Sequence, residues 1–256
     1  MPMPKALLCL LGETAGGSEE VDLRAAGFAT AIIRWRELSA MRFGWMQLAG
    51  ILDDPSVCAW VMTGAPEDFT PDVLAQTTLL MLSLRRPHPP VLAILSQRPP
   101  VPHLPMVIGN HARVFSPGEV FAGRLMAARF KPAPTPTRPC HLQPHLDPLA
   151  GLWLEVGPPR EETWNGFMIG TLAAEVAAFG VGPRGMVPRR TTLAHPICGI
   201  QGEVEGKPFG ACAARNIVSE STACFVLVQG TPHGMFVGDY PEGQTSETSM
   251  RVDFVN

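Results

Sequence analysis

The chain has 256 residues, of which 46% are hydrophobic and 17% charged, so it can bury a sizeable core and lacks a disordered composition. Its net charge of −3 and the lack of any long basic run argue against nucleic acid as a partner. Six cysteines are scattered without a Cys-x-x-Cys pair. This pattern favours reduced thiols and predicts a cytoplasmic location.

The most apolar run near the N-terminus is Ala6–Leu11. It is too short to cross a membrane, and no small-residue cleavage site follows it. We therefore expect a buried strand there and no membrane partner.

Five short runs in the first half are rich in Val, Ile and Leu without clean alternation, which is typical of strands covered on both faces. Helical spacing links Met41 to Ile51 and Val73 to Leu84, and proline ends both segments. The alternation predicts an α/β layered fold, but it does not separate an open flavodoxin-like sheet from a spiral core. The expected strands are Ala6–Leu11, Ala29–Arg34, Val57–Met62, Pro90–Leu95 and Ala112–Phe115.

A proline-rich stretch, 131–139, has no apolar periodicity and reads as an extended connector. We expect an α/β core over residues 1–130, a connector over 131–150 and an α+β part over 151–256, rich in antiparallel strands. Apolar residues at helical spacing predict one amphipathic helix over 164–179. The strands expected after it are Ile197–Val204 paired with Phe209–Ala214, Cys224–Gln229 paired with Met235–Val237, and a final Ser249–Val255.

Four segments of the first half occur in an order and spacing that suggest a family. Gly27–Ile33 is an opening strand, and Leu48–Phe69 carries a helix, an Asp-Pro-Ser-Val turn, a strand and a Thr-Gly-Ala loop. Leu82–Leu95 adds a helix and a strand, and Ala112–Ser116 adds another strand. Together they resemble the crotonase (enoyl-CoA hydratase/isomerase) superfamily. The resemblance implies a crotonase-like ββα spiral in the N-terminal part only.

The resemblance also implies a thioester site built from two backbone N–H donors. Asp72 and Val73 match the loop that supplies the first donor. Pro102 falls in the turn that supplies the second, and proline has no N–H, so the oxyanion hole would be altered. His103 could donate a hydrogen bond in its place. Glu119 lies near a position where the family carries an acid.

The function implied by the resemblance is binding of an acyl thioester, linked to coenzyme A or a carrier protein, with hydratase, isomerase or lyase chemistry. Coenzyme A, as a substrate carrier, is the only cofactor-like group suggested. The alternative is a non-catalytic subunit on a degenerate crotonase fold that binds a protein partner. Crotonases trimerise, so the resemblance also implies a homo-oligomer.

A second alternative is a Cys/His enzyme that depends on a metal or a thiol. Cys140, His141, His145 and Asp147 form the densest group of metal-ligating residue types. They lack a standard ligand spacing, so polar loop residues are the expected interpretation and no metal site is predicted.

Two further patterns in the sequence contain residue types that can carry chemistry. Cys212 with His195 or His233 could form a nucleophile–base pair, although a buried inert thiol fits the apolar surroundings of Cys212 better. Residues 12–17 have the glycine spacing of a P-loop, but Ser18 and Glu19 stand where lysine and a hydroxyl residue are needed. A phosphate loop and a dinucleotide fingerprint are therefore not predicted.

Overall fold

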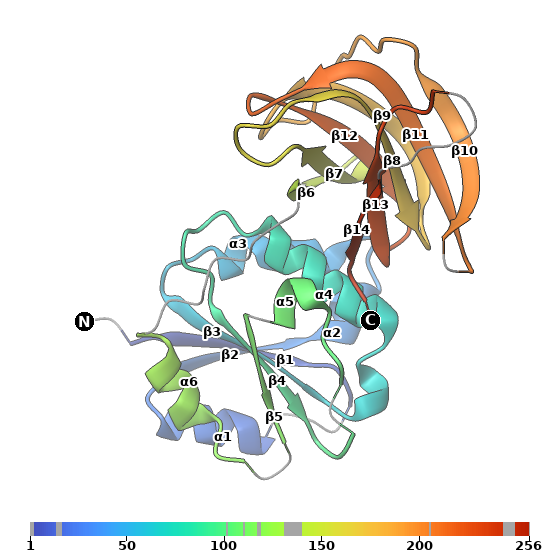
Figure 1. Ribbon diagram of the computed structural model, residues 1–256. Helices are drawn as coiled ribbons and strands as arrows, with labels where there is room; N and C mark the ends of the chain where they lie inside the picture. Colours follow the sequence, from blue (N-terminus) through green and yellow to red (C-terminus); the bar gives the residue numbers. More distant parts are fainter. Residues whose placement is uncertain are drawn as a thin grey trace. The chain divides into compact units, whose positions relative to one another are not determined.

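The computed structural model describes residues 3–13, 17–100, 102–109, 111–116, 119–130, 140–204, 206–242 and 249–255. The chain divides into two compact units, Met1–Pro136 with Asn256, and Thr137–Val255 (Figure 1). Within the described ranges, no helix has the length and apolar character needed to cross a membrane.

The first unit is built on one parallel sheet of five strands in the order β2-β1-β3-β4-β5. All five strands expected from the Val, Ile and Leu runs are present. This open order is the doubly wound, flavodoxin-like arrangement. The strands are β1 (Lys5–Leu10), β2 (Ala29–Arg34), β3 (Val57–Gly64), β4 (Val91–Ser96) and β5 (Ala112–Phe115).

The predicted crotonase-like spiral is therefore wrong. From β1 the chain moves outward to β2, then crosses back to place β3 on the other side of β1, with parallel neighbours throughout. The four segments behind the resemblance are strand–helix–turn–strand pieces that any α/β unit contains. Their spacing describes local structure and does not fix the order in which strands enter the sheet.

Helices cover both faces of this sheet. In Figure 1, α1 and α6 lie on one face, while α3 and α4 lie on the other. The best-defined helix start is that of α4, where the Thr70 hydroxyl accepts a hydrogen bond from the Val73 N–H at 3.3 Å and Pro71 occupies the first turn. The helices are α1 (Gly17–Ala25), α2 (Trp35–Ser39), η1 (Gly44–Gln47), α3 (Leu48–Leu52), η2 (Pro66–Asp68), α4 (Pro71–Ser83), α5 (Met106–Gly109) and α6 (Ala122–Ala128).

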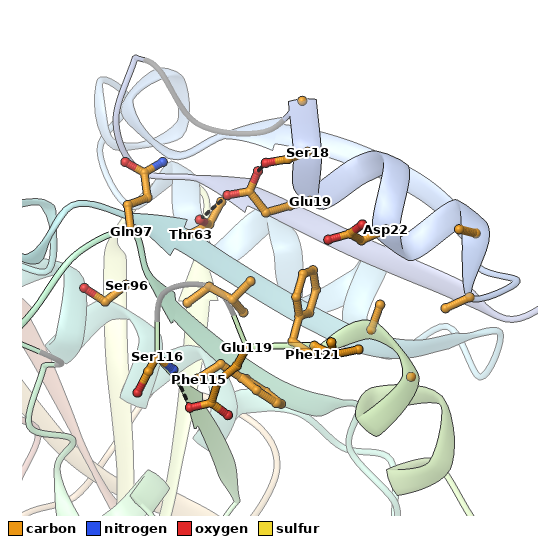
Figure 2. Close-up of a pocket in the computed structure, with 17 residues that line it drawn as sticks. Ser18, Glu19, Asp22, Thr63, Ser96, Gln97, Phe115, Ser116, Glu119 and Phe121 are labelled. Atoms are coloured by element: carbon orange, nitrogen blue, oxygen red, sulfur yellow. Dashed lines mark hydrogen bonds between the residues drawn. The ribbon is translucent and has the colours of Figure 1, made fainter.

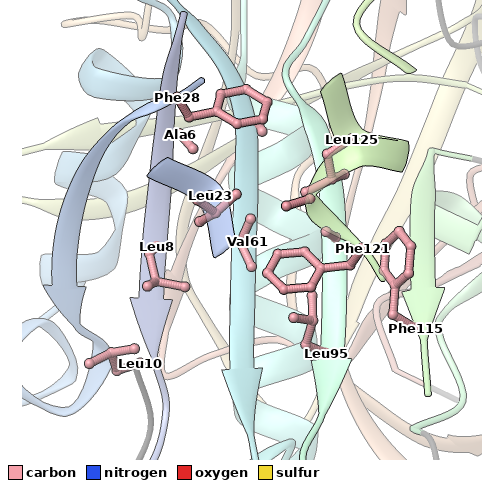
Figure 3. Close-up of a cluster of buried hydrophobic side chains, with 13 residues drawn as sticks. Ala6, Leu8, Leu10, Leu23, Phe28, Val61, Leu95, Phe115, Phe121 and Leu125 are labelled. Carbon is pink, nitrogen blue, oxygen red and sulfur yellow. The ribbon is translucent and has the colours of Figure 1, made fainter. Parts of the chain in front are cut away.

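Alternate side chains of the central strands enter separate cores on the two faces, as expected for strands. On the α1 and α6 face, Leu8 and Val61 of the sheet meet Leu23 of α1 and Leu125 of α6 (Figure 3). On the opposite face, the fully buried Trp60 donates its indole N–H to the sulfur of Cys9 at 3.2 Å.

The second unit consists of two antiparallel sheets with the orders β10-β11-β8-β13-β14 and β6-β7-β12-β9. Apolar side chains such as Leu154, Ile169 and Val226 are fully buried within it. The strands are β6 (His141–Asp147), β7 (Gly151–Gly157), β8 (Trp164–Leu172), β9 (Glu175–Pro183), β10 (Ile197–Val204), β11 (Lys207–Val218), β12 (Thr222–Gln229), β13 (Gly234–Gly238) and β14 (Ser249–Asp253).

The α+β character predicted for residues 151–256 is wrong, because the range expected as a helix, 164–179, forms strand β8 and most of strand β9, which belong to different sheets. Phe167, Ile169 and Thr171 alternate toward one face of β8 and are buried. Glycine is unfavourable within a helix, and Gly170 is needed here because any Cβ at this position would overlap the ring of Phe236. Among the described residues of this unit, all regular elements are strands.

Two other expectations for this part had mixed outcomes. β10 and β11 pair as an antiparallel hairpin, which confirms that prediction. β12 and β13 were expected to pair with each other, but β12 joins β7 and β9, whereas β13 joins β8 and β14. Within the range expected as a connector, His141–Asp147 form β6, while residues 131–139 lie outside the described part of the chain.

Candidate functional site

The first unit has a crevice of about 1070 Å³ at the carboxyl ends of β3, β4 and β5. It lies on the face covered by α1 and α6 (Figure 2). Ligands of open α/β sheets bind in crevices outside the carboxyl ends of the strands. This hollow lies at that edge of the sheet, beside the point between β1 and β3 where the strand order reverses.

One wall of the crevice carries a carboxylate held in a fixed position. The hydroxyl of Thr63, at the end of β3, donates to Glu19 Oε1 at 2.9 Å, and the hydroxyl of Ser18 donates to Oε2 at 2.9 Å. Thr63 is fully buried, whereas Glu19 is half-buried. Asp22 lies one helical turn further along α1 and also lines the crevice.

The facing wall contains a second anchored carboxylate, Glu119. The Ser116 N–H donates to its Oε1 at 3.1 Å, and the Arg124 guanidinium donates to Oε2 at 2.8 Å. The hydrogen bond from Ser116, followed by the pairing with Arg124, lowers the pKa of Glu119 below its ordinary value. Figure 2 shows this carboxylate on the β5 side of the crevice, across from Glu19.

Aromatic rings form the apolar part of the lining. Phe115 ends β5 and Phe121 immediately precedes α6, and their rings meet edge to face with centroids 6.1 Å apart. Both are about 4% exposed, so most of each ring belongs to the core and only a margin borders the crevice. The site therefore combines an apolar base with polar groups at its rim, as small-molecule sites commonly do.

The neighbouring loops close the point between β1 and β3 where the strand order reverses. A Cβ added at Gly12, after β1, would lie 2.7 Å from Asp68 Oδ2, and one at Gly64, at the end of β3, would lie 3.0 Å from the same oxygen. Asp68 is held there because its Oδ2 accepts the Ala65 N–H at 2.8 Å. Ligand space is therefore displaced onto the α1 and α6 face.

Charge limits what the crevice can hold. Its described lining includes the carboxylates of Glu19, Asp22 and Glu119 and contains no lysine, arginine or histidine. Gln97 and the buried Ser96, whose hydroxyl donates to the Arg98 carbonyl at 2.6 Å, also line it at the end of β4. A phosphate placed here would meet like charge without a side-chain cation to pair with it.

The residues predicted from the family resemblance are not brought together. Glu119 lines the crevice, whereas His103, Pro102, Asp72 and Val73 do not. His103 is exposed in the segment between β4 and α5, and Pro102 beside it is partly buried. Asp72 and Val73 lie in the first turn of α4, where the Val73 N–H already serves the Thr70 cap.

In the second unit, sequence reasoning missed the carboxylate that holds His141 and His145 together. Their Nε2 atoms lie 2.7 Å from the two oxygens of Glu155, which is 1% exposed on the neighbouring strand β7. The Gly185 N–H donates to the same carboxylate at 2.9 Å. Burial opposes ionisation of Glu155, but the hydrogen bonds from both histidines and Gly185 outweigh it and lower the pKa to about 2.

The other two residues of the Cys140, His141, His145 and Asp147 cluster, Cys140 and Asp147, are not hydrogen-bonded to Glu155 in the described contacts. Cys140 is buried, and Asp147 accepts the N–H groups of Ala150 and Leu149 in the turn after β6, which lowers its pKa. Within the described ranges, no three His, Cys, Asp or Glu side chains are arranged to hold a metal ion. The Nε2 atoms of both histidines are directed at Glu155.

Cys212, for which an inert buried thiol was the favoured interpretation, is 1% exposed, and its thiol contacts the Ile169 carbonyl at 3.7 Å. Burial raises the pKa of this thiol to about 12, so it stays protonated at neutral pH. His195 is exposed, and its carbonyl accepts a hydrogen bond from the Tyr240 hydroxyl at 3.1 Å. His233 is partly buried and immediately precedes β13.

The fold defines a doubly wound α/β unit with a carboxyl-edge crevice, followed by an antiparallel β unit. Comparison with protein-family models found no match for the chain, and comparison with curated proteins found no match either.

Proposed function

We propose that the first unit binds a small polar molecule without phosphate groups in the crevice between α1 and α6. The observation that carries this proposal is the position of the hollow at the carboxyl edge of a doubly wound sheet. Its volume of about 1070 Å³ is adequate for a metabolite-sized ligand.

The chemical class follows from the anchored groups. Glu19 is fixed by Thr63 and Ser18, so its carboxylate offers acceptors in a constant place. Such acceptors suit hydroxyl, amide or ammonium donors on a ligand. Because Glu19, Asp22 and Glu119 all line the crevice, an uncharged or cationic ligand is favoured over an anion.

Acyl-thioester binding, a partner-binding scaffold and a metal- or thiol-dependent enzyme stay predictions that no finding tests. Acyl-thioester binding and the partner-binding scaffold were inferred from a crotonase-like core, and the open sheet of the first unit is not such a core. Coenzyme A also carries phosphates, which the acidic lining of the crevice does not favour.

A substitution that fills the crevice tests the proposal. Gly123 on α6 lines the crevice, and a Cβ added there meets no heavy atom within 4 Å. Gly109 on α5 is equally open but does not line it, so Gly109→Leu is the matched control for Gly123→Leu. The intact protein would be screened by thermal shift against polyols, amines, amino acids, inorganic phosphate and nucleotides.

We expect at least one polyol, amine or amino acid to stabilise the wild type and Gly109→Leu, but not Gly123→Leu. A ligand at a hundred times its dissociation constant stabilises the folded state by about 2.7 kcal/mol, which such a screen detects readily. Stabilisation only by phosphate or nucleotides, or an equal effect on Gly123→Leu, would contradict the proposal.

A further inference from the structure

The second unit contains a separate groove of about 910 Å³. Its walls are the residues of β9, at the edge of one sheet, and those of β10 and β11, at the edge of the other. This groove belongs to the antiparallel unit and shares no lining residue with the crevice described above.

Part of the space in the groove lies beside a glycine of β11, Gly210. Gly210 on β11 is paired with Thr171 on one side and Gln201 on the other. A Cβ added at Gly210 meets no heavy atom within 4 Å. Packed sheets lie about 10 Å apart and need side chains from both to fill the space between them. A glycine at this position leaves that space empty.

The lining exposes more apolar than polar surface and is almost uncharged, with Gln201 and Gln229 among its polar residues. Val176 and Phe179 of β9 and Ile200 of β10 contribute partly buried hydrocarbon surface. Cys212, two residues after Gly210, adds a buried thiol whose pKa is raised to about 12 by burial, so it stays neutral. Glu175 is the only charged side chain among the described lining residues.

This surface restricts the chemistry of a ligand. An anionic group inside the groove would lose its hydration without a paired charge, and so would a cationic group placed away from the exposed Glu175, which is costly. A hydrocarbon chain would gain by leaving water. We propose that the groove between β9 and β10–β11 binds a neutral, mainly hydrocarbon small molecule, of the type that an alkyl or acyl chain represents.

The test uses three probes of equal chain length and different charge: 1-decanol, decanoate and decylamine. Each would be titrated calorimetrically into the intact protein. The variant Gly210→Leu places a side chain in the groove, and Gly50→Leu is its control, because a Cβ at Gly50 on α3 of the first unit also meets no heavy atom within 4 Å. Thermal melts of both variants without ligand check that they fold.

We expect 1-decanol to bind the wild type and Gly50→Leu at least about tenfold more tightly than either charged probe. Gly210→Leu should weaken that binding by about tenfold or more. The absence of 1-decanol binding to the wild type would overturn the proposal. So would equal affinity for a charged probe or undiminished binding to Gly210→Leu.

A second measurement uses only the wild type, so it tests the proposal even if Gly210→Leu does not fold. A photoreactive diazirine analogue of 1-decanol, cross-linked to the wild type, locates the bound chain by mass spectrometry. Labels on Glu175–Phe179, Cys198–Gly202 or Pro208–Cys212 support the groove. Labels confined to other segments contradict it.

Discussion

Replacing Glu155 by glutamine tests how much one buried carboxylate contributes to the second unit. Glu155 accepts hydrogen bonds from His141, His145 and the Gly185 N–H while being 1% exposed. The fall of its pKa from 4.5 to about 2 corresponds to about 3 kcal/mol of stabilisation at neutral pH. Glutamine keeps the shape but turns an N–H₂ group toward one donor, so Glu155→Gln should lose about that amount.

The lowered pKa of Glu155 also predicts how the effect of this substitution on the unfolding free energy depends on pH. Because the pKa of Glu155 is lower in the folded protein than in the unfolded chain, its stabilisation is fully present above a pH of about 4.5. It is lost as the pH falls toward about 2. The difference in unfolding free energy between wild type and Glu155→Gln should therefore be largest near neutrality and shrink across that acid range.

Urea unfolding of the intact chain between pH 2.5 and 7.5 measures this difference. Tryptophan fluorescence reports Trp153, which is paired with His145 beside the cluster, together with the four other tryptophans of the chain. Circular dichroism reports the strands. Glu175→Gln, at an exposed position of β9, is the control and should change stability little. An unchanged unfolding free energy at neutral pH, or a difference that persists undiminished at pH 2.5, would refute the reasoning.

Three further changes have expected outcomes, each measured by urea unfolding. Gly170→Ala forces a Cβ into the ring of Phe236 and should cost about 1–3 kcal/mol, and no loss would contradict the packing described for β8. Leu154→Ala removes a fully buried side chain from β7 and should cost about 2–5 kcal/mol; a loss under about 1 kcal/mol would count against that burial. Thr63→Val removes the hydroxyl that holds Glu19 and should cost about 1 kcal/mol, and a gain in stability would argue against that hydrogen bond.

The strands of the first unit were predictable because each is a short run rich in apolar residues, and the central strands are buried along most of their length. Val57–Gly64 and Val91–Ser96 need no distant information to be recognised as strands. Their order in the sheet was not predictable, since it depends on where each helix crosses. A resemblance assembled from local segments consequently suggested the wrong core.

The helix predicted over 164–179 failed for a different reason. Phe167, Thr171 and Leu172 satisfy helical spacing, yet Phe167, Ile169 and Thr171 satisfy strand alternation equally well. The glycines at 166 and 170 were the signal that should have decided between them.

The candidate site was only partly visible in the sequence. Ser18 and Glu19 stood out as departures from a phosphate loop. Nothing in the local sequence indicated that Glu19, on α1, would contact Thr63, on β3. Glu155 carried a clearer signal: it interrupts the apolar residues Leu154 and Val156, as a residue on the opposite strand face would. Pairing between β6 and β7 then brings it to the histidines.

Asp68 lies so close to Gly12 and Gly64 that larger residues are poorly tolerated at these two positions, whereas other parts of the first unit can accept substitutions. A methyl group at either glycine would displace the Asp68 carboxylate, so this junction resists variation even though no ligand is expected to touch it. Residues bordering the hollow on the α1 and α6 side, such as Asp22, carry no comparable packing constraint. Altered ligand preference could therefore arise by substitution on that side while the scaffold beneath it stays the same.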